Sequence, residues 1–207
     1  MNVPPLLTFP VRPIQGGRLE LAPPKRGPWY AEPKFNGWRA LVHTPTGTMW
    51  NRHGALLTIV DCFRPALTAL AKLADRGLVW ADCEALERRH NLGRGTLVVL
   101  DLVPESGTPS YEERRSVMET LIPTHAVFSG EAARPVPCGV VVLTPTFRAD
   151  ARAGALGFYQ QLRVANRALG CDFFEGVVMK RADSPYPVQT RSSSEKFRGW
   201  VKHRFLK

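Results

Sequence analysis

The spacing of apolar residues along the chain predicts three helices. Between residues 65 and 76 apolar positions form one stripe, with a proline in the first turn and Gly77 just beyond the last. A second helix is expected from Ser110 to residue 122, because Ser110 and Glu113 form a capping-box pattern at its start. A third helix is expected over 150–169, where a glycine follows.

Alternating and continuous apolar runs predict strands between these helices. The first strand region is expected to be interrupted by a turn at Lys34, and the prolines and glycines of residues 1–30 and 124–137 favour irregular structure. Strands and helices alternate irregularly, with hairpins near the start, so we expect an α+β fold with mostly antiparallel sheets. The strand regions are 29–43, a hairpin over 46–59, then 78–86, 96–103, 140–143, 174–180 and 199–205.

The net charge of the chain indicates the kind of partner it binds, but it says little about the fold. The chain has 207 residues, which suits one large domain or two small ones, and a formal net charge of +10. This balance favours a polyanion such as nucleic acid, although a merely soluble basic protein would also show it. Cations and aromatic rings are interleaved at the C-terminus, a pattern that suits phosphate contact with base stacking. They are Lys196, Phe197, Arg198, Trp200, Lys202, His203, Arg204, Phe205 and Lys207.

The cysteines and the hydropathy favour a cytoplasmic protein. Cys62, Cys83, Cys138 and Cys171 lie too far apart for a zinc-type spacing, and their apolar or small neighbours indicate buried free thiols. The N-terminus has neither the charged region nor the cleavage site of a signal peptide. No apolar run approaches the roughly 20 residues that a membrane span needs.

Candidate chemistry is concentrated in six short segments. The first begins with Lys34, an amine beside a tight turn and a fixed cation, which suits a nucleophile that attacks a phosphate. Glu84 and Glu175 each adjoin an apolar strand, and a carboxylate beside a buried strand needs a partner. Asp101 suits either a structural cap or a site role. The segments are KFNGWR (34–39), NRHG (51–54), ADCE (81–84), VVLDL (98–102), EGVVMK (175–180) and WVKHR (200–204).

The order and spacing of these segments resemble the covalent nucleotidyltransferases, which comprise ATP-dependent DNA ligases, RNA ligases and mRNA-capping enzymes. Two stretches, PSYEERR (109–115) and EGVVMKRADSPY (175–186), look most like the bacterial ATP-dependent DNA ligases associated with end-joining repair. The resemblance covers nearly the whole chain from about residue 10. It implies an ATP-grasp-like nucleotidyltransferase domain over residues 1–207, with mostly antiparallel sheets flanked by helices.

The resemblance also implies a reaction. Lys34 would attack the α-phosphate of ATP and release pyrophosphate, and the resulting lysyl-AMP would pass AMP to the 5′-phosphate of a nick in duplex DNA. A 3′-hydroxyl would then displace the AMP. Nearby cations would disfavour the ammonium form of the lysine and hold the triphosphate. The candidates for these cations are Arg39, Lys180, Lys202 and Arg204.

Further site residues follow from the same resemblance. Glu32 would contact the adenine edge, and Arg52 the ribose or a phosphate. Glu84 would contact the ribose or a metal, and Glu175 would support a metal, with Mg²⁺ (or Mn²⁺) expected. Leu100 occupies the place where an aromatic ring usually stacks on the adenine, which predicts weaker nucleotide affinity.

Besides Leu100, the chain departs from the family pattern in three ways, and these departures leave alternatives open. Asn36 stands where most members have aspartate, and Cys83 where they have glycine. The chain ends three residues after Arg204, where typical members continue into an OB-fold. We therefore expect a stand-alone adenylation domain whose first step is slow or needs a protein partner. An RNA ligase is the first alternative, and a nucleic-acid-binding module that has lost turnover is the second.

Overall fold

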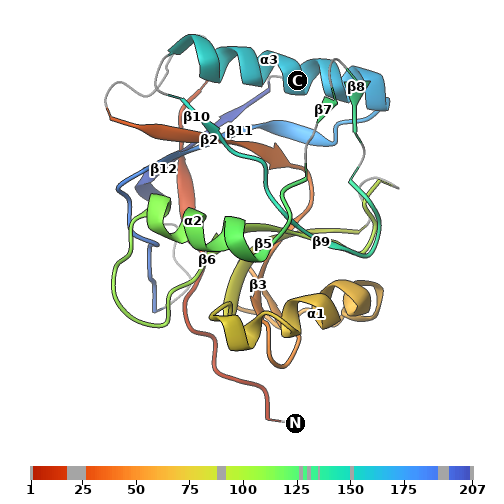
Figure 1. The fold of residues 1–207 in the computed structure, drawn as a ribbon, viewed down its shortest axis with the longest axis vertical. Helices are drawn as coiled ribbons and strands as arrows, with labels where there is room; N and C mark the ends of the chain where they lie inside the picture. The colour runs from red at the N-terminus through yellow and green to blue at the C-terminus, as the bar shows by residue number, and fades with distance from the viewer. Residues whose placement is uncertain are drawn as a thin grey trace.

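Two five-stranded sheets form the frame of the molecule (Figure 1). The computed structural model describes residues 2–17, 27–87, 92–125, 128–129, 132–134, 136–149, 152–190 and 196–205. The first sheet has the order β1 (Arg12–Gln15), β12 (Lys196–Arg204), β11 (Phe174–Arg181), β2 (Trp29–Phe35) and β10 (Phe147–Arg148). The second has the order β4 (Thr48–Asn51), β3 (Trp38–His43), β5 (Trp80–Leu86), β6 (Thr96–Leu102) and β9 (Val141–Leu143).

The pairing confirms the expected α+β fold with mostly antiparallel sheets. In the two large sheets only β1–β12 and β6–β9 are parallel pairs among the described strands. A separate hairpin joins β7 (Phe128–Ser129) and β8 (Ala132–Ala133). The helices are α1 (Arg64–Ala71), α2 (Tyr111–Leu121) and α3 (Arg152–Leu169). None of these helices combines the length and apolar character that a bilayer crossing requires.

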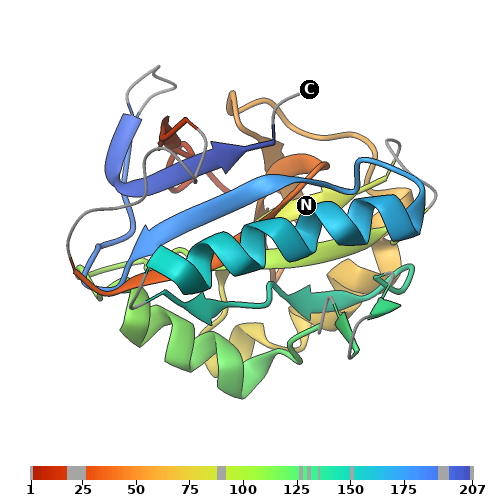
Figure 2. The same ribbon diagram turned by 90° about the horizontal axis from the view of Figure 1, so that it is seen from above.

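Helices cover the outer faces of the sheets. Figure 2 shows α3 lying along β11, and its Tyr159 and Leu162 belong to the same apolar cluster as Val177 and Met179 of that strand. The outer face of the second sheet packs against α1 and α2. Every second residue of β5 faces this layer, including the buried thiol of Cys83. The opposite faces of the two sheets are therefore left to build a site.

Several predicted boundaries were wrong for local reasons. Lys34 lies within β2, and the turn falls at Asn36 and Gly37, where Gly37 is needed because a Cβ atom would lie 2.7 Å from the carbonyl oxygen of Ala85. The first 30 residues were expected to be irregular, but β1 pairs with β12. The loop expected over 124–137 contains the β7–β8 hairpin.

Three other predictions met different outcomes. The first predicted helix ends early, and a separate 3₁₀ turn at Ala74–Arg76 follows it. The capping box of α2 is confirmed, since the Ser110 hydroxyl accepts from the Glu113 amide while the Glu113 carboxylate accepts from the Ser110 amide. Of the four thiols only Cys83 is buried, and Cys138 is exposed, contrary to the expectation of four buried thiols.

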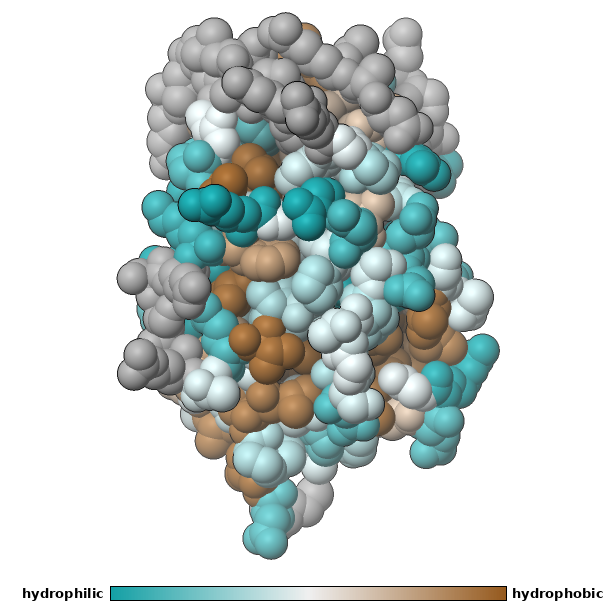
Figure 3. Space-filling view, turned by 90° about the vertical axis from the view of Figure 1, so that its left-hand side faces the viewer, coloured by the Kyte–Doolittle hydropathy of each residue, from teal (hydrophilic) through white to brown (hydrophobic). Residues whose placement is uncertain are grey.

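The large hydrophobic side chains that are exposed come from different parts of the chain. On the side that faces left in Figure 1, a band of hydrophilic residues lies above a region where hydrophobic and hydrophilic residues are mixed (Figure 3). Single exposed apolar residues are normal for a folded protein. Those with large exposure are Val3, Leu56, Val117, Phe147, Val164 and Val188.

A buried ionic network joins the two sheets to α2. The Nζ atom of Lys180 on β11 lies 3.1 Å from the carboxylate of Glu32 on β2 and 3.3 Å from that of Asp101 on β6. Arg114 of α2 binds both carboxylate oxygens of Asp101, at 2.8 and 3.1 Å. Burial by itself would raise the pKa of Asp101, but Lys180 and Arg114 outweigh it and hold that pKa below its ordinary value.

Removing the charge of Asp101 is expected to destabilise the fold strongly. Asp101→Asn would leave Lys180 and Arg114 buried with one carboxylate fewer between them, at a cost of about 3–5 kcal/mol in the free energy of unfolding. Urea unfolding at pH 7 measures this. The matched control is Asp183→Asn, which breaks the exposed pair with Arg181 and should cost less than about 1 kcal/mol. Similar losses in both variants would show that the network does not carry this stability.

Candidate active site

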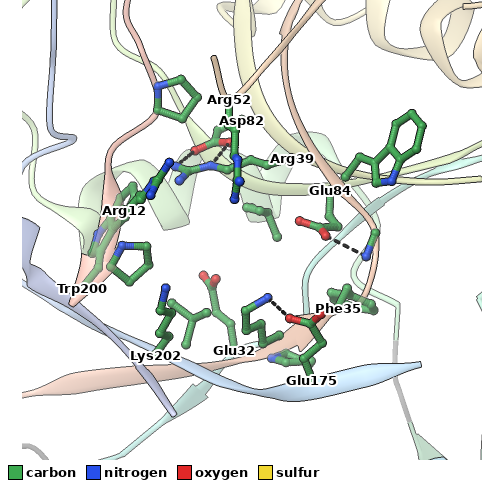
Figure 4. A pocket seen from close by; sticks show the side chains of 18 of the residues that line it. Arg12, Glu32, Phe35, Arg39, Arg52, Asp82, Glu84, Glu175, Trp200 and Lys202 are labelled. Carbon is green, nitrogen blue, oxygen red and sulfur yellow. Dashed lines mark hydrogen bonds and ion pairs between the residues drawn. The ribbon is translucent and has the colours of Figure 1, made fainter. Parts of the chain in front are cut away.

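A pocket of about 490 Å³ opens between the two sheets (Figure 4). It brings together every site residue predicted from the sequence, although they are spread over most of the chain. These residues are Glu32, Lys34, Arg39, Arg52, Glu84, Leu100, Glu175, Lys180, Lys202 and Arg204. Their clustering is the main observation on which a functional interpretation rests.

Strand alternation explains one wall of the pocket. On β2 the side chains of Glu32 and Lys34 line the pocket, while Trp29 and Ala31 pack into the core beneath α3. The same period of two places Val178 and Lys180 of β11 on this wall, and Trp200, Lys202 and Arg204 of β12 beside them.

The second sheet supplies the opposite wall in the same way. Asp82 and Glu84 of β5 line the pocket, and the residues between and beside them face α1 and α2. Arg39 of β3 lies on the same wall. Arg52 is exposed in the turn after β4, and its Nε atom contacts the imidazole of His53 at 3.1 Å.

Lys34 is paired with a carboxylate rather than surrounded by cations alone. Its Nζ atom forms an ion pair with Glu175, and Arg204 lies 3.3 Å from the same carboxylate. Glu175 precedes Gly176, whose backbone passes so close to β12 that a Cβ atom would lie 2.0 Å from the carbonyl oxygen of His203. The glycine thus permits the close approach of β11 and β12 beside the lysine.

The cations expected beside Lys34 differ in whether a carboxylate pairs with them. Arg39 is held by Asp82, with Nε 2.9 Å from one carboxylate oxygen, and Lys180 lies in the buried network. Lys202 has no carboxylate within ion-pair distance among the described residues. Burial lowers its pKa, and the charges of Arg204, Lys34, Arg12 and Lys196 lower it further. Of these cations, Lys202 interacts electrostatically with Lys34, and Arg204 shares the Glu175 carboxylate with it.

Glu84 is held in an environment that disfavours its charge. Burial raises the pKa of this carboxyl group to about 7, against the lowering effects of Lys34, a hydrogen bond from the Gly37 amide at 2.8 Å and Arg39. Glu175 adds to the rise by like-charge repulsion. The carboxyl group is thus poised to gain from any cation that enters the pocket.

Glu32 lies at the buried end of the pocket. It is 2% exposed, it accepts a hydrogen bond from the Tyr111 hydroxyl, and it forms an ion pair with Lys180. Burial raises the pKa of Glu32, while Lys180 and Tyr111 oppose the rise. Because a phenol donates to it and an ammonium is paired with it, the carboxylate is a fixed hydrogen-bond acceptor at this end.

The sequence interpretation missed a second set of pocket residues. Asp82 binds Arg39 and accepts from the Tyr186 hydroxyl at 2.9 Å, and the Arg39 guanidinium lies 5.5 Å from the ring centre of Trp200. Alternation with Glu84 on one strand was the signal that could have identified Asp82. No comparable signal marks Arg12, which enters the pocket from β1.

Leu100 lines the pocket at an irregularity in the sheet. The register of β5 with β6 passes from Asp82–Asp101 to Cys83–Val99, which leaves Leu100 without an opposite residue. Its carbonyl oxygen accepts a hydrogen bond of 2.7 Å from Lys180. The leucine at this position therefore offers an aliphatic surface to a ligand, together with Val178.

Two of the departures from the family pattern lie outside the pocket. The amide nitrogen of the Asn36 side chain donates to the carbonyl oxygen of Asp172 at 3.0 Å, a bond that an ionised aspartate could not make. Cys83 faces the apolar layer beneath α1 and α2. Asn36 thus joins the end of β2 to the start of β11.

The aromatic residues near the C-terminus do not form a stacking surface. Trp200 is 2% exposed, and Phe197 packs edge-on against it. Phe205 packs edge-on against Tyr159 of α3. These rings are therefore taken up by packing, whereas the cations at Lys196, Arg198 and Arg204 are exposed.

The residues present fit a divalent cation that shares its ligands with a phosphate. Within the described ranges no group of three or more acidic, histidine or cysteine side chains could hold a metal by itself. Glu84 and Glu175 both line the pocket, where their like charges repel each other. Mg²⁺ is typically held by one or two carboxylates with phosphate oxygens and water, so two glutamates suffice if a nucleotide supplies the remaining oxygens.

Comparisons with solved structures identify the fold. The ligase domain of M. tuberculosis LigD matches with a TM-score of 0.59 at 20% sequence identity, covering 95% of this chain. Chlorella virus DNA ligase–adenylate matches with a TM-score of 0.58 at 17% identity over 96% of this chain. An archaeal ATP-dependent RNA ligase matches with a TM-score of 0.58 at 17% identity over 95%. The chain has the nucleotidyltransferase fold of these ligases.

The structural similarity is partial in length and low in sequence identity. The chain spans 59% of the M. tuberculosis domain, 68% of the viral ligase and 48% of the archaeal one. No protein-family model and no curated protein gives a significant match to the sequence. Because the sequence identities are low, the structural similarity establishes the fold alone. The activity of the protein depends on the side chains that line the pocket.

Neutralising Glu84 is expected to stabilise the protein in a pH-dependent way. Its pKa is raised from 4.5 to about 7, so the stability present below pH 4.5 is lost as the pH rises through 7. Glu84→Gln should therefore raise the free energy of unfolding by about 1–3 kcal/mol at pH 8, and by much less near pH 4.5, without nucleotide and with a chelator present. Denaturant unfolding at both pH values measures this.

The control for this experiment is Glu105→Gln, at an exposed position outside the pocket, which should change stability little at either pH. A stabilisation by Glu84→Gln that is the same at both pH values would mean that it does not come from the ionisation of Glu84.

Proposed function

We propose that this protein is an ATP-dependent polynucleotide ligase that forms a covalent adenylate on Lys34 and seals nicks in duplex DNA. The observation that carries the proposal is the placement of Lys34, which is paired with Glu175 and lines a pocket that also contains the β12 cations Lys202 and Arg204. An amine, a proton acceptor and phosphate-binding cations in one pocket are the groups that nucleotidyl transfer requires.

Lys34 acts as the nucleophile in the proposed reaction. Its ammonium passes one proton to the Glu175 carboxylate with which it is paired, and the lone pair of the resulting amine forms a bond to the α-phosphorus of ATP. The second proton leaves the bonded nitrogen to solvent. The bond from that phosphorus to the bridging oxygen breaks, and pyrophosphate leaves with the electron pair. Arg204 and Lys202 lie where they stabilise the charge that develops on the phosphate oxygens.

Glu32, Leu100 and Val178 form the base-binding end in this proposal. Glu32 presents a carboxylate acceptor whose position is fixed by Lys180 and Tyr111, which suits the exocyclic amine of adenine. The two aliphatic side chains offer apolar surface to a base. Without an aromatic ring at Leu100 the contribution of stacking, about 0.5–1.5 kcal/mol, is absent.

Glu84 and Glu175 would hold Mg²⁺ (or Mn²⁺) together with phosphate oxygens. Such an ion supplies Lewis-acid polarisation of the phosphate when it is bound. Its charge would also relieve the unfavourable ionisation of Glu84.

An RNA ligase is the second candidate function. The archaeal ATP-dependent RNA ligase shares the fold as closely as the viral DNA ligase does, so the fold does not favour either nucleic acid. Asn36, which motivated this candidate, contacts Asp172 outside the pocket. The choice of DNA therefore rests on the sequence resemblance to end-joining ligases.

Lys34→Ala is expected to abolish covalent labelling. Protein incubated with α-labelled ATP and magnesium, then denatured, should carry label, and the variant should lose at least about 1,000-fold of it because the nucleophile is gone. Lys72→Ala, which removes an exposed lysine after α1, should label like the wild type. An adduct that survives Lys34→Ala would refute the nucleophile assignment.

The nucleotide and the pH extend this assay to the other candidates. Labelling by GTP in preference to ATP would point to a capping activity. If neither nucleotide forms an adduct at any pH up to about 9, both ligase hypotheses are refuted. The nucleic-acid-binding module that has lost turnover would then be the remaining candidate.

Nicked substrates separate the DNA and RNA candidates. The adenylated protein should seal a nicked DNA duplex with a 5′-phosphate at least about tenfold faster than the same nick in duplex RNA. Its affinity for the DNA should also weaken at least about tenfold between roughly 50 and 200 mM salt, because cations contact the phosphates. Preferential sealing of RNA would favour the second candidate, and affinity independent of salt would contradict electrostatic binding.

A further inference from the structure

The N-terminal segment is built into the pocket wall. The Phe9 amide donates to the carbonyl oxygen of Gln189 at 2.9 Å, and the Gly16 amide donates to that of Lys202 at 3.0 Å. Between these anchors the Val11 carbonyl oxygen accepts a hydrogen bond from Arg39. These contacts fix the course of β1 on both sides of Arg12, so the Arg12 side chain enters the pocket from a held backbone.

Cationic side chains outnumber carboxylates in the pocket lining. Asp82 is matched by Arg39, Glu32 by Lys180, and Glu175 by Lys34 and Arg204. Arg12 has no carboxylate within ion-pair distance in the described part of the chain, and Lys202 shares this situation. The seven cations are Arg12, Lys34, Arg39, Arg52, Lys180, Lys202 and Arg204, and the four carboxylates are Glu32, Asp82, Glu84 and Glu175.

Like charges held close together in a partly buried pocket repel one another. The effect is visible at Lys202, whose pKa is lowered first by burial and then by cations that include Arg12. Such an arrangement is unfavourable in the empty protein and becomes favourable when a polyanion enters. The surplus of cations therefore matches a triphosphate better than a monophosphate.

The position of Arg12 indicates which part of a triphosphate it would meet. Figure 4 shows Arg12 on the side of the pocket that carries Trp200, across from Glu84 and Glu175. The α-phosphate has to lie at Lys34, which is paired with Glu175. The guanidinium of Arg12, on the other side of the pocket, could therefore contact the β- and γ-phosphates. Its planar group can donate hydrogen bonds to two phosphate oxygens at once.

We propose that Arg12 binds the terminal phosphates of ATP and so positions the pyrophosphate that leaves when Lys34 attacks. This inference rests on the proposed function, because it assigns a role within the same nucleotide site. It gives the N-terminal segment a direct part in substrate binding, beyond pairing with β12.

Direct binding measurements test the proposal without turnover. Isothermal titration of the full chain with α,β-methylene ATP, which cannot be cleaved at the reacting bond, is compared with titration by AMP. Arg12→Ala should weaken binding of the ATP analogue about 10- to 100-fold and binding of AMP less than about twofold, because only the analogue carries the terminal phosphates. Arg12→Lys should recover part of the loss, since it keeps a point charge but not the fork.

The control is Arg163→Ala, which removes one exposed cation from α3 away from the pocket and should bind both nucleotides like the wild type. Thermal unfolding of each variant by circular dichroism checks that the fold is intact, and Arg12→Lys serves if Arg12→Ala fails to fold.

The outcomes separate this proposal from the proposed function. Equal weakening of AMP and the analogue would mean that Arg12 only shapes the pocket and would overturn the proposal, as would unchanged binding of the analogue. If Lys34 of the wild type is labelled by ATP while Arg12→Ala binds the analogue normally, only the role of Arg12 fails. A wild-type protein that binds neither nucleotide would overturn both.

Discussion

The amine of Lys180 holds the two sheets together at the base of the pocket. It lies between Glu32 of the first sheet and Asp101 of the second, and Arg114 connects Asp101 to α2. Buried charges are tolerated only when each has its partners, so these groups define the relative position of three elements. The walls of the pocket, with Lys34 on one side and Glu84 on the other, depend on that position.

In the rest of the pocket, by contrast, some charged groups are not stabilised by their surroundings. Glu84 is held with its pKa raised to about 7 and Lys202 with its pKa lowered, each because burial and like charges disfavour its ionised form. These costs are spread over the part of the pocket where a metal ion and phosphates would bind. A protein that carries such unfavourable charges gives up stability for a site that is ready for its ligand.

The departures from the family pattern separate into two kinds once the structure is considered. Asn36 and Cys83 serve the fold, the first by a hydrogen bond to the Asp172 carbonyl oxygen and the second by packing beneath α1 and α2. Leu100 is different, because it lines the pocket where a base would lie. In the proposed function its side chain would contact the nucleotide, whereas the other two positions do not line the pocket.

The sequence by itself determined which side chains share a face. The period of two along β2, β5 and β12 places Glu32 with Lys34, Asp82 with Glu84, and Lys202 with Arg204, and the capping box marks the start of α2. Only the tertiary structure decided which faces meet and which charges pair, as Lys34 does with Glu175 across 141 positions of the chain. It also brought β1 and Arg12 to the pocket from a stretch that looked irregular. The reason is that local periodicity depends on neighbouring residues, whereas sheet order and ion pairing depend on how the apolar outer faces pack against helices from distant parts of the chain.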